Sequence, residues 1–222
     1  IIRQQDISSF NKNLTAYKRM IVLLDVHENY KTEIERLINE GKRINDLMAA
    51  YTFLNDCYGK IDELEQLVIQ KEQGKSWVEI FTNYNNKNIA FVPRNFDFNY
   101  LDELMTKEGI TTDDIMICDR VSQKSGVPYE EIIELRLEGK TWKEINAELG
   151  IVNAQNIMPH VPVTPEQIKK YTADGRLNEE EVVFALVTSY KLGIDETEAI
   201  NKAKSGYTPE MFFSEAVEKK YY

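Results

Sequence analysis

The chain has 222 residues, 42% of them hydrophobic and 29% charged, which is typical of a folded protein with a sizeable core and excludes a largely disordered chain. Its 27 Lys and Arg residues against 37 Asp and Glu residues give a net charge of −10, which disfavours nucleic acid and anionic lipid surfaces as partners. The longest apolar cluster, residues 20–24, is too short to cross a bilayer, so we expect no membrane span.

The N-terminal segment, residues 1–29, is predicted to form one long helix. Glycine and proline are absent before Gly41, and apolar residues recur at three- and four-residue steps, at Ile7, Phe10, Leu14, Tyr17, Ile21 and Leu24. This stripe has two interpretations: it caps the end of the segment that follows, or residues 1–28 self-associate as in a coiled coil. Because the chain starts at Ile1 without methionine, we expect a processed form or a piece of a longer protein.

After residue 29 the glycines divide the chain into three similar segments. Nine of the ten glycines form three sets with equivalent members 65 to 68 residues apart, namely Gly41, Gly59 and Gly74; Gly109, Gly126 and Gly139; and Gly175, Gly193 and Gly206. A regular period near 67 residues indicates tandem repeats. We therefore predict an all-α protein in which three repeats, residues 30–99, 100–163 and 164–222, stack into an elongated helical array.

Each repeat is predicted to contain four short helices that end near its glycines, because a helix C-terminus often needs a left-handed residue. In the first repeat the helices are placed at 30–40, 44–58, 61–73 and 76–85, and the other repeats follow by adding the period. A capping box starts the helix after the third glycine in two repeats, formed by Ser76 with Glu79 and by Thr141 with Glu144.

The two tryptophans, Trp77 and Trp142, occupy the same position, three residues after the third glycine of their repeats. The favoured interpretation is that each indole fills the gap between helices of its own repeat, because buried indoles dominate core contacts. The alternative is that an indole stacks on a ligand.

The segments between repeats, residues 83–99 and 150–164, are predicted to be extended because prolines at 93, 159 and 162 oppose a helix there. If the chain has a binding surface, we expect it where these crossings meet the ends of the repeats, near Phe91, Arg94, Phe96 and His160. Packing into the core is the competing role for the aromatic residues.

Catalytic motifs are absent from the sequence. His27 and His160 lie on different predicted elements, the long helix and a crossing, and no nucleophile elbow, phosphate-binding glycine loop or metal-spaced Cys/His set is present. Cys57 and Cys118 form no CxxC pair and are expected to be buried thiols. We predict no enzyme activity, no cofactor and no metal site.

Two phrases, residues 74–80 (GKSWVEI) and 139–145 (GKTWKEI), resemble a phrase that recurs in uncharacterised helical tandem repeats of bacterial proteins. That resemblance implies a helical-repeat fold and no known activity. Residues 139–151 also resemble the opening of bacterial helix-turn-helix modules, which implies a nucleic-acid-binding regulator as the alternative function. The stretch that follows, residues 152–162, has no Lys or Arg for a recognition helix.

The function predicted from the sequence is a non-enzymatic scaffold that binds a protein or a peptide, because stacked repeats form a continuous binding surface. The sequence does not determine the cellular compartment, because it fits a soluble protein in the cytoplasm as well as one exported after removal of an upstream signal. Since the third repeat would reach its crossing at Tyr222, we expect the natural chain to continue beyond that residue.

Overall fold

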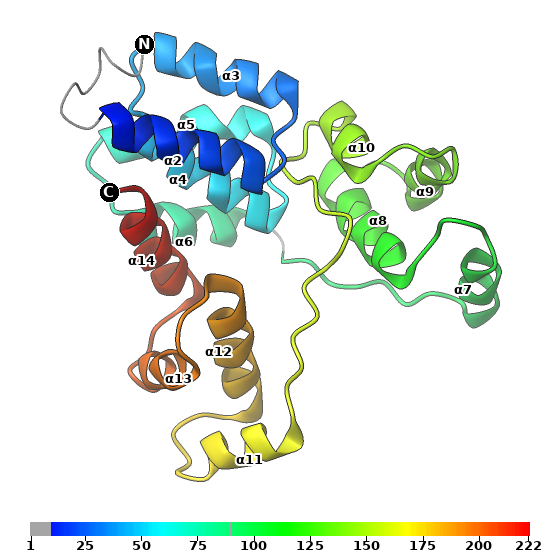
Figure 1. The fold of residues 1–222 in the computed structure, drawn as a ribbon. Helices are drawn as coiled ribbons and strands as arrows, with labels where there is room; N and C mark the ends of the chain where they lie inside the picture. The colour runs from blue at the N-terminus through cyan, green and yellow to red at the C-terminus, as the bar shows by residue number, and fades with distance from the viewer. Residues whose placement is uncertain (1–9, 89) are drawn as a thin grey trace. The chain divides into compact units, whose positions relative to one another are not determined.

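The computed structural model of the protein describes residues 10–88 and 90–222, and over these residues the secondary structure is helical apart from one isolated bridge between Lys60 and Ile151 (Figure 1). The chain divides into two compact units. The first comprises the residues up to Met158 together with Tyr221 and Tyr222, and the second comprises Pro159–Lys220. The all-α class predicted from the sequence is confirmed.

The helices of the first unit follow one another with short connections. They are α2 (Phe10–Leu23), α3 (Glu28–Asn39), α4 (Ile44–Cys57), the 3-10 turn η1 (Ile61–Glu63), α5 (Leu64–Glu72), α6 (Trp77–Lys87), α7 (Phe98–Met105), α8 (Thr112–Ser125), α9 (Tyr129–Leu137) and α10 (Trp142–Glu148). With η1 and α5 taken together, the four helices predicted between residues 30 and 85 are confirmed to within two residues at each end.

The single long helix predicted over residues 1–29 is wrong. α2 ends at Leu23, and Asp25 then adopts a left-handed conformation with φ of 45°, which Asp tolerates better than most residues. His27, expected inside the long helix, is instead the N-cap of α3, where its Nδ1 accepts a hydrogen bond from the Asn29 N–H at 3.2 Å. Residues 1–9 of the predicted helix lie outside the described residues.

α2 lies against the helices that follow it. Its Tyr17 and Met20 are buried, and the Tyr17 hydroxyl donates to a carboxylate oxygen of Glu35 in α3 at 3.3 Å. Burial of these side chains fits the cap interpretation of the stripe. Self-association through residues 1–28 stays a prediction.

Eight of the nine glycines in the repeated sets have positive φ angles, between 64° and 94°, as expected at helix ends. Gly59 is the exception, because the preceding residue, Tyr58, takes the left-handed position that ends α4. Glycine is required at position 59 for a different reason, because a side chain would not fit there. A Cβ at this position would lie 2.4 Å from Leu54 Cδ2 and 2.7 Å from the Tyr84 hydroxyl.

The turn that contains Gly59 pairs with the segment that follows α10. The Ile61 N–H donates to the Gly150 carbonyl at 2.9 Å, and the Val152 N–H donates to the Gly59 carbonyl at 2.8 Å. The hydroxyl of Tyr30, in α3, lies 3.1 Å from the carbonyl oxygens of both Asn146 and Ile151. These bonds satisfy buried backbone groups across a wide separation in sequence.

The second unit contains α11 (Pro165–Thr172), α12 (Glu179–Leu192), α13 (Glu196–Lys204) and most of α14 (Pro209–Tyr221). Its hydrophobic core is a small cluster of side chains, namely Tyr171, Leu177, Val182, Ala185, Leu186 and Ile200. Capping boxes formed by Thr164 with Gln167 and by Asn178 with Glu181 start its first two helices.

Candidate functional site

The predicted binding residues Phe91, Arg94 and Phe96 lie in the crossing between α6 and α7, whereas His160 belongs to the second unit. The Arg94 side chain anchors this crossing. Its Nε donates to Asp119 Oδ1 at 2.5 Å, its backbone N–H donates to Asp119 Oδ2 at 2.9 Å, and the Asp119 side chain is only 4% exposed. A buried carboxylate needs such a partner, so the ion pair is part of the fold.

The aromatic residues of the crossing also pack inward. The Phe96 ring meets the Tyr129 ring edge-on at 5.2 Å between centroids, and the Arg94 guanidinium lies 4.8 Å from the centre of the Tyr129 ring. Phe91 lies 5.8 Å from the guanidinium of Arg120, which also covers Tyr58. Phe96 packs against the hydrophobic core, which favours the core-packing role for this residue, whereas Phe91 contacts the Arg120 side chain.

A buried polar network surrounds Asp114, the third residue of α8. Its carboxylate accepts hydrogen bonds from the Thr111 N–H at 2.9 Å, from Arg136 Nε at 2.8 Å and from Trp142 Nε1 at 2.8 Å. Burial opposes ionisation of this carboxyl, but the hydrogen bonds from Thr111, Arg136 and Trp142 outweigh burial and hold the pKa of Asp114 below its ordinary value. The network closes one end of α8 against α9 and α10.

Both tryptophans are fully buried, which fits the packing interpretation of their shared position. Trp142 donates directly to Asp114, whereas Trp77 Nε1 donates to the Tyr222 hydroxyl at 3.1 Å. The Tyr222 hydroxyl donates in turn to Asp46 Oδ1. Asp46 is the third residue of α4, as Asp114 is of α8.

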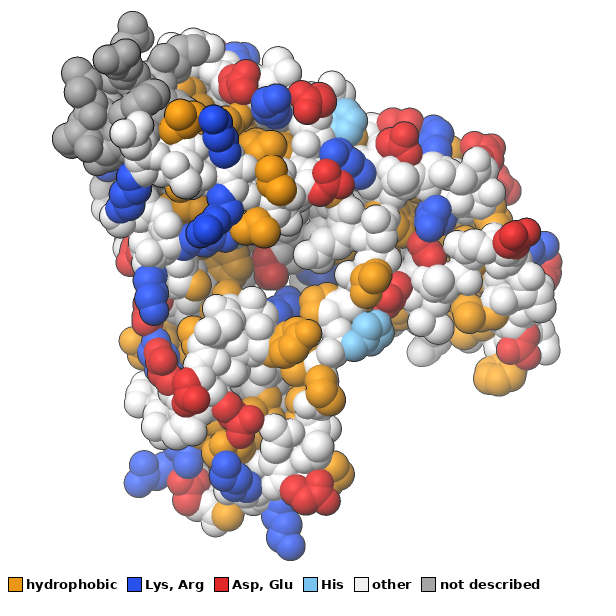
Figure 2. All heavy atoms as spheres, viewed as in Figure 1, with side chains coloured by type: hydrophobic (Ala, Val, Ile, Leu, Met, Phe, Trp, Pro, Cys, Tyr) orange, Lys and Arg blue, Asp and Glu red, His pale blue; other side chains and the backbone are white. Residues whose placement is uncertain are grey.

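An exposed apolar face on α7 was missed by the sequence reasoning. The exposed fraction is 74% for Phe98 and 45% for Met105, and Figure 2 shows hydrophobic side chains at the surface over this helix. A spacing of seven residues places both on one side of a helix, with Asp102 between them. The signal was available in the sequence, but Phe98 was assigned to the crossing.

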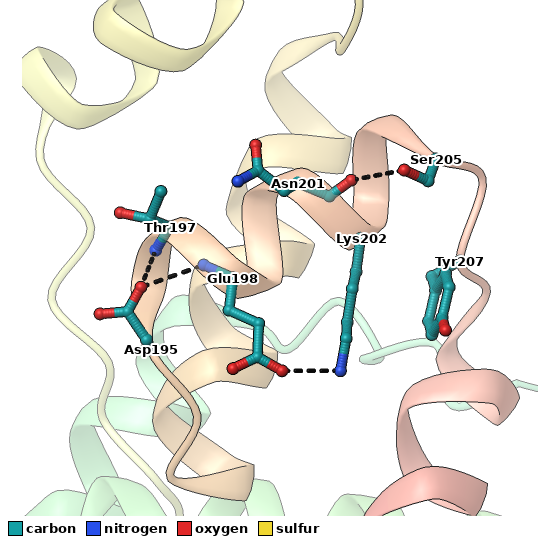
Figure 3. Close-up of a pocket in the computed structure, with 7 residues that line it drawn as sticks. All are labelled: Asp195, Thr197, Glu198, Asn201, Lys202, Ser205 and Tyr207. Atoms are coloured by element: carbon teal, nitrogen blue, oxygen red, sulfur yellow. Dashed lines mark hydrogen bonds and ion pairs between the residues drawn. The ribbon is translucent and has the colours of Figure 1, made fainter.

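The second unit has a shallow hollow of about 580 Å³ on α13, shown in Figure 3. In that view the Lys202 side chain extends toward Glu198, and its ammonium lies 2.7 Å from Glu198 and 2.6 Å from Glu215. Hydrogen bonds with these two carboxylates raise the pKa of Lys202. Because two carboxylates already pair with this ammonium, Lys202 offers little positive charge to an anionic ligand.

Two kinds of site are relevant to the described part of the chain: a cluster of metal ligands and a recognition helix. Among residues 10–88 and 90–222, no three His, Cys, Asp or Glu side chains gather as metal ligands would. The stretch in which a helix-turn-helix module would place its recognition helix, residues 152–162, contains no helix. No helix in the described residues is long and apolar enough to cross a membrane.

Comparison with known proteins assigns no family: no family model, curated protein or solved structure matches the chain. The resemblances carried by residues 74–80 and 139–151 therefore remain predictions.

Proposed function

We propose that the protein is a non-enzymatic scaffold of three helical repeats that binds a protein or peptide partner through the outer face of α7. The repeat is supported by the matching lengths of its helices. α4, α8 and α12 each have 14 residues and start 68 and 67 residues apart, while α5, α9 and α13 each have nine residues and start 65 and 67 residues apart. Helix units related in this way form extended binding surfaces.

The apolar face of α7, defined by Phe98 and Met105, is the observation that carries the binding function. At the offset of 68 residues that separates α4 from α8, the position in the proposed first repeat equivalent to Met105 is Leu37, which is buried. An apolar position that is buried in α3 is therefore exposed in α7. Large apolar side chains exposed on one face of a helix mark a candidate interaction surface.

The partner is an apolar segment that carries basic residues. Asp102 lies exposed between Phe98 and Met105 on the same face, whereas the neighbouring Glu103, 70% exposed, pairs with Lys107 at 3.6 Å. An amphipathic helix with Lys or Arg beside its apolar residues complements both the apolar and the acidic side chains. The net charge of −10 favours the same kind of partner.

The test is selection from a displayed library of random peptides, repeated with two variants. The wild type is expected to select peptides with apolar residues at helical spacing beside Lys or Arg, and Phe98→Asp is expected to bind them at least about tenfold more weakly, the loss for one buried aromatic side chain. Tyr190→Asp is the matched control, because Tyr190 is a 62% exposed aromatic residue on α12. Equal binding by Phe98→Asp and the wild type would exclude α7 as the binding face.

A further inference from the structure

The first unit has two halves, α2 to α6 and α7 to α10, which carry equivalent Trp and Asp residues. In the first half a tyrosine side chain lies between the two residues, whereas in the second half they bond directly. In the second half, Trp142 donates directly to Asp114. In the first half, the equivalent residues Trp77 and Asp46 are joined through the hydroxyl of Tyr222, which accepts from the indole and donates to the carboxylate. We call the space between Trp77, Asp46 and Lys12 the tyrosine niche.

Around the tyrosine niche, the cation equivalent to the arginine of the second half lies over the indole and not beside the carboxylate. Arg136 completes the bonds to Asp114. The residue 65 positions earlier is Lys71, whose ammonium lies 5.3 Å above the Trp77 ring. The Asp46 side chain is only 1% exposed, and its ion pair with Arg43 Nε is long, at 4.0 Å. A phenol hydroxyl, which can donate and accept at once, fits between the buried carboxylate and the buried indole.

The backbone beside the phenol is also bound. Lys12 Nζ donates to the Tyr222 carbonyl oxygen at 2.7 Å, and the hydroxyls of Tyr221 and Thr52 lie 2.7 Å apart. All these residues belong to the first unit. Residues 221 and 222 are therefore bound through three groups: the Tyr222 phenol, the Tyr222 carbonyl and the Tyr221 hydroxyl. A short peptide could be bound through the same kinds of contact.

Tyr222 itself is only partly covered by the rest of the unit. It keeps an exposed fraction of 41%, although burial, followed by the hydrogen bond to Asp46, raises the pKa of its phenol. If the side chain left, Trp77 Nε1 and the Asp46 carboxylate would lose the partner that joins them inside the unit. Buried polar groups without partners are costly, so the empty niche favours another phenol.

We propose that the tyrosine niche is a binding site for a tyrosine side chain and its adjoining backbone carbonyl, that Tyr222 closes it as a releasable latch, and that a tyrosine-bearing peptide occupies it when Tyr222 is withdrawn. This site lies on α2, α4 and α6, so it goes beyond the binding face proposed on α7.

Two tryptophans in one unit provide the measurement, because each gives its own indole N–H signal in a nitrogen-15 NMR spectrum. Tyr222→Phe and Tyr222→Ala are expected to shift the Trp77 signal and to leave the Trp142 signal, held by Asp114, in place. Adding the peptide Glu-Lys-Lys-Tyr-Tyr, the sequence of residues 218–222, to Tyr222→Ala should return the Trp77 signal toward its wild-type position. The same peptide with both tyrosines replaced by phenylalanine is the control and should leave the signal unchanged.

The wild type should respond much less to the peptide, because an attached side chain competes at an effective concentration on the order of millimolar. The latch is refuted if Tyr222→Phe leaves the Trp77 signal where it is in the wild type. The peptide site is refuted if several millimolar peptide does not move that signal in Tyr222→Ala while the Trp142 signal shows that the unit is folded. Neither result depends on Phe98, so failure here is separable from failure of the proposed function.

Discussion

Replacement of Asp114 by alanine tests whether the buried network around this carboxylate holds the first unit together. Asp114→Ala removes the acceptor for the Trp142 N–H, for Arg136 Nε and for the Thr111 N–H. Loss of the capping box costs about 1 kcal/mol, and a buried indole N–H left without an acceptor costs about 1–3 kcal/mol. Loss of the bond to Arg136 adds less to the cost in stability, because 23% of the Arg136 side chain is exposed to water.

These contributions together predict that Asp114→Ala lowers the free energy of unfolding by about 3–4 kcal/mol, a large fraction of the roughly 5–15 kcal/mol typical of a folded protein. Urea unfolding followed by tryptophan fluorescence measures this loss. Both tryptophans lie in the first unit, so the fluorescence reports that unit alone. Asp113→Ala is the control, because it removes the adjacent acid from the same helical turn and is expected to cost about 0.5 kcal/mol.

The same network predicts a dependence on pH. The pKa of Asp114 in the folded state lies below its unfolded value, so the carboxylate stabilises the fold fully above about pH 4 and progressively less as the pH falls below it. Acidification should therefore narrow the stability gap between the wild type and Asp114→Ala. A free energy of unfolding for Asp114→Ala equal to that for Asp113→Ala would refute the account of the network.

Two further predictions concern the crossing and the thiols. Arg94→Ala leaves the Asp119 carboxylate with the backbone N–H of residue 94, so we expect a loss of about 1–2 kcal/mol and faster hydrogen exchange over residues 91–97, whereas the exposed Arg19→Ala should change neither. Burial raises the pKa of the Cys57 thiol to about 12 and raises that of Cys118 as well, so at pH 8 the thiolate fraction of Cys57 is on the order of one in ten thousand. Cys118 is buried, whereas Cys57 is only partly buried, so a thiol reagent should label both cysteines within minutes in guanidinium and much more slowly in the native protein, Cys118 slowest of all. Native labelling of Cys118 as fast as in guanidinium would contradict its burial. Because both pKa values are raised, the stability that these thiols contribute should fall as the pH rises above about 8.5.

Helix positions were predictable because their signals are local. Ser76 with Glu79 and Thr141 with Glu144 start helices through bonds that span three residues, and both capping boxes are present in the structure. The break after α2 was missed for a related reason. The apolar stripe continues past Leu23 without a glycine or proline, and only Asp25 and His27, two weak signals, separate α2 from α3.

The side-chain clusters were less predictable, because their members lie far apart in sequence. Arg94 was recognised as a candidate, but its partner Asp119 lies 25 residues away and carries no local signal. The partners Trp77 and Tyr222 are separated by 145 residues, so periodicity indicated a shared environment for the two indoles and not the phenol beside one of them. Such pairings follow from tertiary packing, which a repeat pattern does not specify.

The pairing of Gly59 and Ile61 with Gly150 and Val152 also bears on how the chain folds. These backbone bonds close a loop of about ninety residues, and the entropy cost of closing a loop grows with the logarithm of its length. Helices on either side form from local contacts, so we expect them to form faster than this long-range pairing. A fragment cut at residue 99 would end with the Gly59 turn unpaired, and the two halves of the first unit are thus expected to fold as one cooperative body.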